Sequence, residues 1–169
     1  VPFVEPEQEK SDATIKGLLK YRHLVYGVIA IFLYVGVEIG IPGTLNFYLA
    51  DPQSGAGLDP ATAGTIAGFV AGTYWFLMLI GRFTSSLISG KVSSKAQLTA
   101  TSAAAIVLVI CAMFTTSIKT SMPVFTGSGF AMVQVPLTAL LLVLCGLCTS
   151  VMWGTIFNLA VEGLGKQSA

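Results

Sequence analysis

The stretch that decides the fold is residues 24–50, LVYGVIAIFLYVGVEIGIPGTLNFYLA. It is longer than the roughly 20 mainly apolar residues that a membrane-spanning helix needs. Its single carboxylate, Glu38, lies near the middle of the run. A charge at membrane depth costs about 2.5–3.5 kcal/mol on insertion scales, so such a residue normally faces protein or a water-filled cavity. The stretch therefore predicts a spanning helix with an ionisable group that serves a function.

Three backbone-altering residues follow that carboxylate: Gly40, Pro42 and Gly43. Proline donates no backbone hydrogen bond and glycine bends easily, so we predict a helix break beside Glu38. Broken helices at membrane depth occur where they line a cavity, as in transporters. In the alternative interpretation, Glu38 only hydrogen bonds to a neighbouring helix and Pro42 only kinks its own.

The composition places the chain in a lipid bilayer. Hydrophobic residues make up 54% and charged residues only 10%, whereas a soluble domain has about 25% charged residues. The net charge of +1 is too small to indicate a nucleic-acid partner. One peripheral histidine, His23, and one buried glutamate, Glu38, cannot form an acid–base or nucleophilic set. We therefore predict no enzyme activity, no cofactor and no metal.

The apolar runs are too long and too uniform for barrel strands, so the predicted fold is an all-α membrane protein with four transmembrane helices. We place the spans at about 24–50, 61–81, 96–117 and 136–161, within a transmembrane region of residues 23–169. Residues 1–22 are predicted to be a cytoplasmic linker with a short amphipathic helix. The segment between the last two spans reads as a loose connection.

Glycines in the second span recur every four residues, at Gly64, Gly68 and Gly72. Small residues at this spacing let another helix approach closely, so this face is predicted to be a packing surface. The span is predicted to end at Gly81, which places Arg82 in the following loop. No basic residue then remains inside the spans, and Glu38 is expected to have no cationic partner in this chain.

Basic residues fix the expected orientation. They lie before the first span, between the second and third, and after the fourth, while the other two loops hold only Lys119. By the positive-inside rule, both ends of the chain and the middle loop are cytoplasmic. The chain does not begin with Met and is expected to be a piece of a longer protein of the cytoplasmic membrane.

Three segments of the chain carry a family resemblance: FLYVGVEIG (32–40), IGRFTSSLI (80–88) and MWGTIFNLAVEGLGK (152–166). Together they resemble the second half of the fucose/glucose/galactose permeases, a branch of the major facilitator superfamily that moves sugars with a coupling cation. The seventh-helix pattern of that family is aromatic-Tyr-Val-Gly-x-(Gln or Glu). Residues 33–38 match it, except that Leu33 replaces the aromatic residue. The eighth helix of that family ends with Gly-Arg-Phe, which matches Gly81, Arg82 and Phe83. In the tenth-helix pattern, Pro-Thr-Ile-Phe-x-Leu, Gly154 replaces the proline.

The resemblance implies a fragment of the C-terminal six-helix half of a major facilitator fold. The four spans would be helices seven to ten of twelve, and the missing helices of the same transporter would be partners of the chain. The implied function is cation-coupled sugar symport across the cytoplasmic membrane, with H+ or Na+ as the coupling ion.

Candidate site residues are those that can hydrogen bond to sugar hydroxyls, stack on a sugar ring or carry a proton. For sugar binding or coupling they are Glu38, Tyr34, Asn46, Trp153, Thr155 and Asn158. Arg82 is assigned to gating at the cytoplasmic loop. Packing remains the alternative role for Tyr34 and Trp153, because aromatic residues also anchor helices.

Two other functions are compatible with the sequence. A small four-helix multidrug exporter coupled to protons also places one glutamate in its first helix. A membrane scaffold that does not transport would use the polar groups of the first and fourth spans only as contacts between helices.

Overall fold

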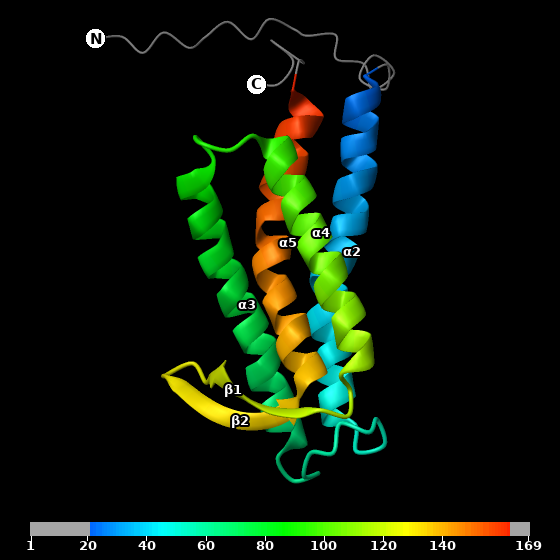
Figure 1. The fold of residues 1–169 in the computed structure, drawn as a ribbon, viewed down its shortest axis with the longest axis vertical. Helices are drawn as coiled ribbons and strands as arrows, with labels where there is room; N and C mark the ends of the chain where they lie inside the picture. Colours follow the sequence, from blue (N-terminus) through cyan, green and yellow to red (C-terminus); the bar gives the residue numbers. More distant parts are fainter. Residues whose placement is uncertain (1–20, 163–169) are drawn as a thin grey trace, which may run out of the picture.

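The computed structural model describes residues 21–162 as four long helices and one β-hairpin (Figure 1). All four helices are long and apolar enough to cross a membrane, which confirms a membrane protein with four spanning helices. The amphipathic helix expected within residues 1–22 falls almost wholly outside the described residues. The elements are α2 (Arg22–Ala50), α3 (Ala63–Ile88), α4 (Ser94–Phe114), β1 (Lys119–Phe125), β2 (Phe130–Pro136) and α5 (Leu137–Val161).

Helix α5 is the centre of the bundle and packs against each of the other three helices (Figure 1). The contact between α3 and α5 depends on two glycines, Gly81 and Gly146. A Cβ atom on Gly146 would lie 2.8 Å from the backbone oxygen of Tyr74, and one on Gly81 would overlap the side chain of Ser150. Because no side chain separates the helices here, their backbones approach closely.

This close packing does not use the glycines that the spacing pattern singled out. A Cβ atom on Gly64 or Gly68 would meet nothing within 4 Å among the described residues, and one on Gly72 would meet only a strand carbonyl at 3.8 Å. Within the described residues this face meets no other helix, so its role in close packing stays a prediction. Four-residue spacing identifies a face of a helix but not the neighbour that the face meets.

Helix α2 is continuous from Arg22 to Ala50, with Pro42 inside it. The break predicted at Gly40, Pro42 and Gly43 is therefore wrong for this structure. A proline removes only the hydrogen bond to the carbonyl four residues earlier, here that of Glu38. Beyond this point Leu45 and Leu49 are fully buried, so their packing keeps this part of the helix in place.

The hairpin lies across one end of the bundle, where the sequence analysis expected a loose connection (Figure 1). Its strands are antiparallel, and Phe125 pairs with Phe130 beside the turn. The backbone N–H of Phe125 donates to Thr73 Oγ1 of α3 at 2.8 Å, and the Phe125 ring stacks on Phe76 with centroids 4.8 Å apart. The alternating burial of Met122 and Val124 is typical of a strand. The turn-forming residues of the segment had hidden this alternation.

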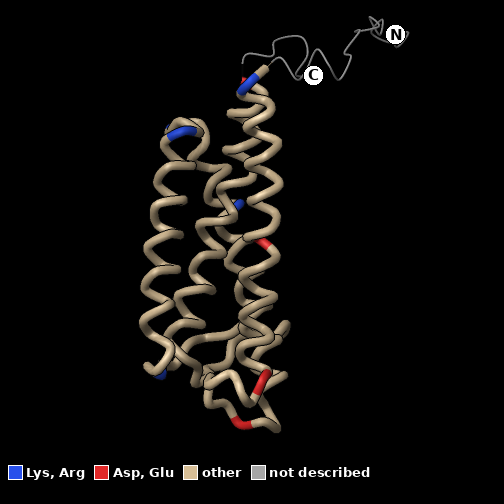
Figure 2. Tube along the Cα trace, turned by 90° about the vertical axis from the view of Figure 1, so that its right-hand side faces the viewer, with Lys and Arg blue, Asp and Glu red and all other residues tan. Residues whose placement is uncertain are grey.

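Most charged residues gather at the two ends of the bundle, with one acidic and one basic position between them (Figure 2). Arg22 begins α2, and Lys91 and Lys95 lie at the connection between α3 and α4, so all three belong to one end. Asp51 and Asp59 lie in the connection between α2 and α3, at the opposite end.

Candidate functional site

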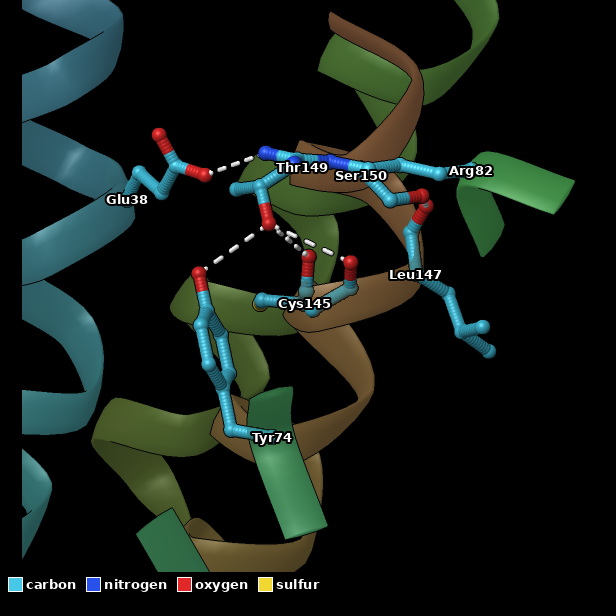
Figure 3. Close-up of polar contacts among 8 residues, drawn as sticks. Glu38, Tyr74, Arg82, Cys145, Leu147, Thr149 and Ser150 are labelled. Carbon is cyan, nitrogen blue, oxygen red and sulfur yellow. Dashed lines mark hydrogen bonds and ion pairs between the residues drawn. The ribbon is translucent and has the colours of Figure 1, made fainter. Parts of the chain in front are cut away.

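The two charges at depth form an ion pair between α2 and α3. Arg82 Nη2 donates a hydrogen bond to Glu38 Oε1 at 2.7 Å (Figure 3). The Glu38 side chain is 13% exposed and that of Arg82 is 53% exposed. The expectation that Glu38 has no cationic partner is therefore wrong. A charge-assisted bond of this length neutralises the carboxylate and connects the two helices.

Arg82 was assigned to a loop because the apolar character of the second span fades after Gly81. In the structure α3 continues through Arg82 to Ile88, so this assignment and the end of the span at Gly81 are wrong. The polar residues that follow are compatible with a helix, in which a hydroxyl can bond to a carbonyl of the preceding turn. Thr84 Oγ1, for example, donates to the carbonyl of Ile80 at 2.9 Å. The Arg82 side chain extends from α3 past Thr149 and Ser150 of α5 to Glu38 (Figure 3).

Tyr34 lies one helical turn before Glu38, on the same face of α2. The residue is only 4% exposed, and its hydroxyl makes no hydrogen bond within the described part of the chain. It lies close to both members of the ion pair. It also faces an apolar cavity of about 550 Å³ among α2, α4 and α5. A buried hydroxyl without a partner is costly, so Tyr34 is poised to bond to a group that moves or binds there.

A second tyrosine, Tyr74 on α3, connects α3 to α5 close to the ion pair. Its hydroxyl bonds to Thr149 Oγ1 at 3.0 Å, and Thr149 in turn donates to the carbonyls of Cys145 and Gly146 (Figure 3). Tyr74 and Thr149 are completely buried. This satisfied network holds α3 against α5 directly below the Arg82 side chain.

A polar cleft of about 310 Å³ opens among α3, α4 and α5, and Arg82 is part of its wall. Eight of its twelve lining residues carry a hydroxyl or amide group, and no carboxylate is among the lining residues. The lining residues are Arg82, Ser85, Ser86, Ser89, Ser94, Gln97, Ser150, Val151, Trp153, Gly154, Thr155 and Asn158. Inside the cleft, the hydroxyl of Ser85 donates to Gln97 Oε1 at 3.3 Å. Arg82 therefore belongs both to the ion pair and to the cleft.

The structure brings three predicted site residues of α5 to this cleft. Trp153 and Asn158 line it and are exposed. The Trp153 ring is 48% exposed and stacks on Phe157 with centroids 5.7 Å apart and an interplanar angle of 3°. Thr155 also lines the cleft, but it is buried and its hydroxyl donates to Val151 and Met152 of its own helix. Asn46 lies two turns beyond Glu38 along α2 and is not among the lining residues of the cleft.

Six polar lining residues were not predicted from the sequence, namely Ser85, Ser86, Ser89, Ser94, Gln97 and Ser150. A signal for three of them was present. Arg82, Ser85, Ser86 and Ser89 follow the i, i+3, i+4, i+7 spacing of one helix face. This polar stripe would have been recognised if the helix had been extended beyond Gly81. Among the residues that the structure describes, no three His, Cys, Asp or Glu side chains lie close enough to hold a metal ion.

The sequence of the chain is similar to those of known sugar transporters. The chain is 30% identical over 98% of its length to a glucose/galactose transporter of Brucella abortus. It is 28% identical over its whole length to a putative glucose/galactose transporter of Helicobacter pylori, and 28% identical over 97% to the L-fucose-proton symporter of Escherichia coli. The chain spans about a third of the length of these relatives. No family model and no solved structure matches it.

Proposed function

We propose that this chain, which is homologous to glucose/galactose transporters and an L-fucose-proton symporter over a third of their length, is part of a cation-coupled sugar transporter. The observation that carries the proposal is the ion pair between Glu38 and Arg82 within the spanning helices, beside a cleft lined by sugar-compatible groups. Ionisable residues at membrane depth typically mark substrate or ion pathways.

The cleft has the chemistry that a neutral monosaccharide requires. Its hydroxyl and amide groups can exchange hydrogen bonds with sugar hydroxyls, and the exposed ring of Trp153 can cover an apolar face of the sugar. Its volume of about 310 Å³ lies at the small end of the range known for ligand pockets. Because Glu38 neutralises Arg82, the resting site favours an uncharged ligand.

Glu38 is the proposed coupling residue, with H+ or Na+ as the ion. A direct hydrogen bond from Glu38 to the substrate is the alternative role, although Glu38 is not among the residues that line the cleft. We place the protein in the cytoplasmic membrane, with the end that holds Arg22, Lys91 and Lys95 in the cytoplasm, since basic loops remain on that side. Transporter sites lie between repeats, so further helices of the same protein would complete the substrate path.

Uptake of labelled glucose, galactose and fucose by proteoliposomes tests the proposal. The protein encoded by the complete reading frame should accumulate at least one of these sugars when an inward proton or sodium gradient is imposed. The 169-residue chain alone should give no uptake above that of empty vesicles, because only one wall of the path is present. Sugar uptake by the isolated chain would contradict the assignment as part of a transporter. No uptake of any sugar by the complete protein would contradict the sugar function.

Trp153 should contribute an aromatic surface to the bound sugar. In the complete protein, Trp153→Ala should weaken sugar affinity by about fivefold to tenfold, while Trp153→Phe should lose much less, because stacking needs only a ring. Trp75 is a matched control, since it is 45% exposed but is not among the lining residues of the cleft. Trp75→Ala should leave the affinity unchanged. Equal losses for both Trp153 variants, with poor folding, would assign Trp153 to packing.

A further inference from the structure

Arg82 belongs both to the ion pair with Glu38 and to the wall of the cleft. Sugar symport has to couple an ion site to a sugar site. It bonds to Glu38 through Nη2, and it lines the polar cleft together with Ser85 and Ser89. A guanidinium group carries five N–H donors and cannot lose its charge in a protein. Only Glu38 can therefore change the charge of the pair, and whatever happens to Glu38 changes what Arg82 offers to the cleft.

We propose that Arg82 couples proton binding at Glu38 to sugar binding in the cleft; this inference rests on the proposed function. While Glu38 is ionised, it holds the guanidinium toward α2. A proton from the aqueous phase that binds to a Glu38 carboxylate oxygen removes the negative charge, and no other covalent bond changes. The N–H donors of Arg82 then become available to sugar hydroxyls in the cleft. Coupling of this kind is reciprocal, so bound sugar must favour proton binding at Glu38 by the same factor.

The surroundings of the pair support a switch of this kind. The hydroxyl of Tyr34, one turn away on α2, has no hydrogen-bond partner among the described residues and can bond to the neutral carboxyl group once Arg82 has left. On α3 the nearby titratable group is Tyr74, whose hydroxyl is already bonded to Thr149. On α5 the nearby groups are the Cys145 and Cys148 thiols, which are buried.

The small number of charged groups around Glu38 favours a proton over a sodium ion as the coupling ion. Lys95 on α4 is exposed and forms no ion pair with Glu38, so in the part of the chain that the structure describes Arg82 is the sole ion-pair partner of this carboxylate. Glu38 is also the only carboxylate inside the four described helices. Hard metal cations require several oxygen ligands, whereas one carboxylate is enough for a proton.

The test is the affinity of the purified complete protein for labelled sugar at acid and at alkaline pH, with and without sodium. The unmodified protein should bind sugar about tenfold more tightly at acid pH. Glu38→Gln should bind tightly at both pH values, because its neutral side chain holds Arg82 only weakly. Arg82→Met should bind weakly at both pH values. Lys95→Met removes a cation from the same end of the bundle without touching the pair, so it should keep the normal pH response.

The outcomes separate this inference from the sugar function. If the unmodified protein binds no sugar at any pH, the proposed function fails and the coupling inference fails with it. If it binds sugar but Arg82→Met keeps the normal pH response, the coupling role is wrong and the sugar function stands. An affinity that follows sodium instead of pH would overturn the proton assignment. If Arg82→Met does not fold, Glu38→Gln with Arg82→Met removes both charges and should bind weakly at both pH values; pH-dependent binding by this double variant would overturn the inference.

Discussion

Replacing Glu38 with alanine should nearly abolish proton-driven sugar accumulation by the complete protein. The substitution removes the carboxylate that pairs with Arg82 at 2.7 Å, and it leaves a cation without a partner inside the spanning helices. Glu38 is largely buried, and removing one member of a hydrogen-bonded charge pair typically costs a factor of about ten or more in affinity. Glu38→Gln should keep substantial sugar exchange, because its amide oxygen can still accept a hydrogen bond from Arg82 or from the sugar.

Transport assays in proteoliposomes distinguish a sugar-binding role of Glu38 from an ion-coupling role. Exchange of labelled for unlabelled sugar requires only binding, whereas accumulation against a gradient also requires the coupling ion. Glu38→Gln is expected to exchange sugar but not to accumulate it in response to a proton gradient. If it accumulates sugar normally, Glu38 is a binding group and does not carry the ion. Unchanged transport by Glu38→Ala would remove Glu38 from the site altogether.

Gly146→Val should cause a large loss of stability in the bundle. A Cβ atom at this position would lie 2.8 Å from the backbone oxygen of Tyr74 and 3.2 Å from its ring. A backbone cannot rotate away as a side chain can, so α3 would have to move from α5. Overpacking of this kind costs about 1–3 kcal/mol, and we expect the upper end of this range because the clash involves backbone. The hydrogen bond between Tyr74 and Thr149 should be lost as well.

The reactivity of the cysteine thiols with a thiol reagent measures this loss of stability. Cys145 and Cys148 flank Gly146 and are buried, while Cys111 is exposed and serves as an internal reference. In detergent, Gly146→Val should lower the temperature at which Cys145 and Cys148 react with a thiol reagent. Gly64→Ala is the control, since a Cβ atom there meets nothing within 4 Å and alanine favours a helix over glycine. An unchanged temperature for Gly146→Val would mean that α3 and α5 do not approach as the structure describes.

The membrane fold and the family resemblance could both be predicted from the amino-acid sequence. Four spanning helices follow from hydropathy, which depends only on neighbouring residues. The resemblance to sugar permeases followed from short motifs around Glu38, Arg82 and Trp153, and the relatives confirm it. Glu38 stood out because an ionisable group in an apolar run is costly wherever the helix lies.

Only the tertiary structure decided the partner of Glu38. Arg82 is separated from it by 44 positions in the sequence. Whether the two side chains meet depends on the rotation of α2 and α3 about their axes and on how far α3 extends. The cleft is likewise formed by three helices. Its serines could not be recognised as a group from the sequence, because they come together only when α3 and α4 pack beside α5. The contacts at Gly81 and Gly146 were also unforeseen, because spacing indicates a face of a helix but not what packs against it. Hydropathy and motifs are properties of the local chain, whereas ion pairs, clefts and close approaches are properties of the relative placement of helices.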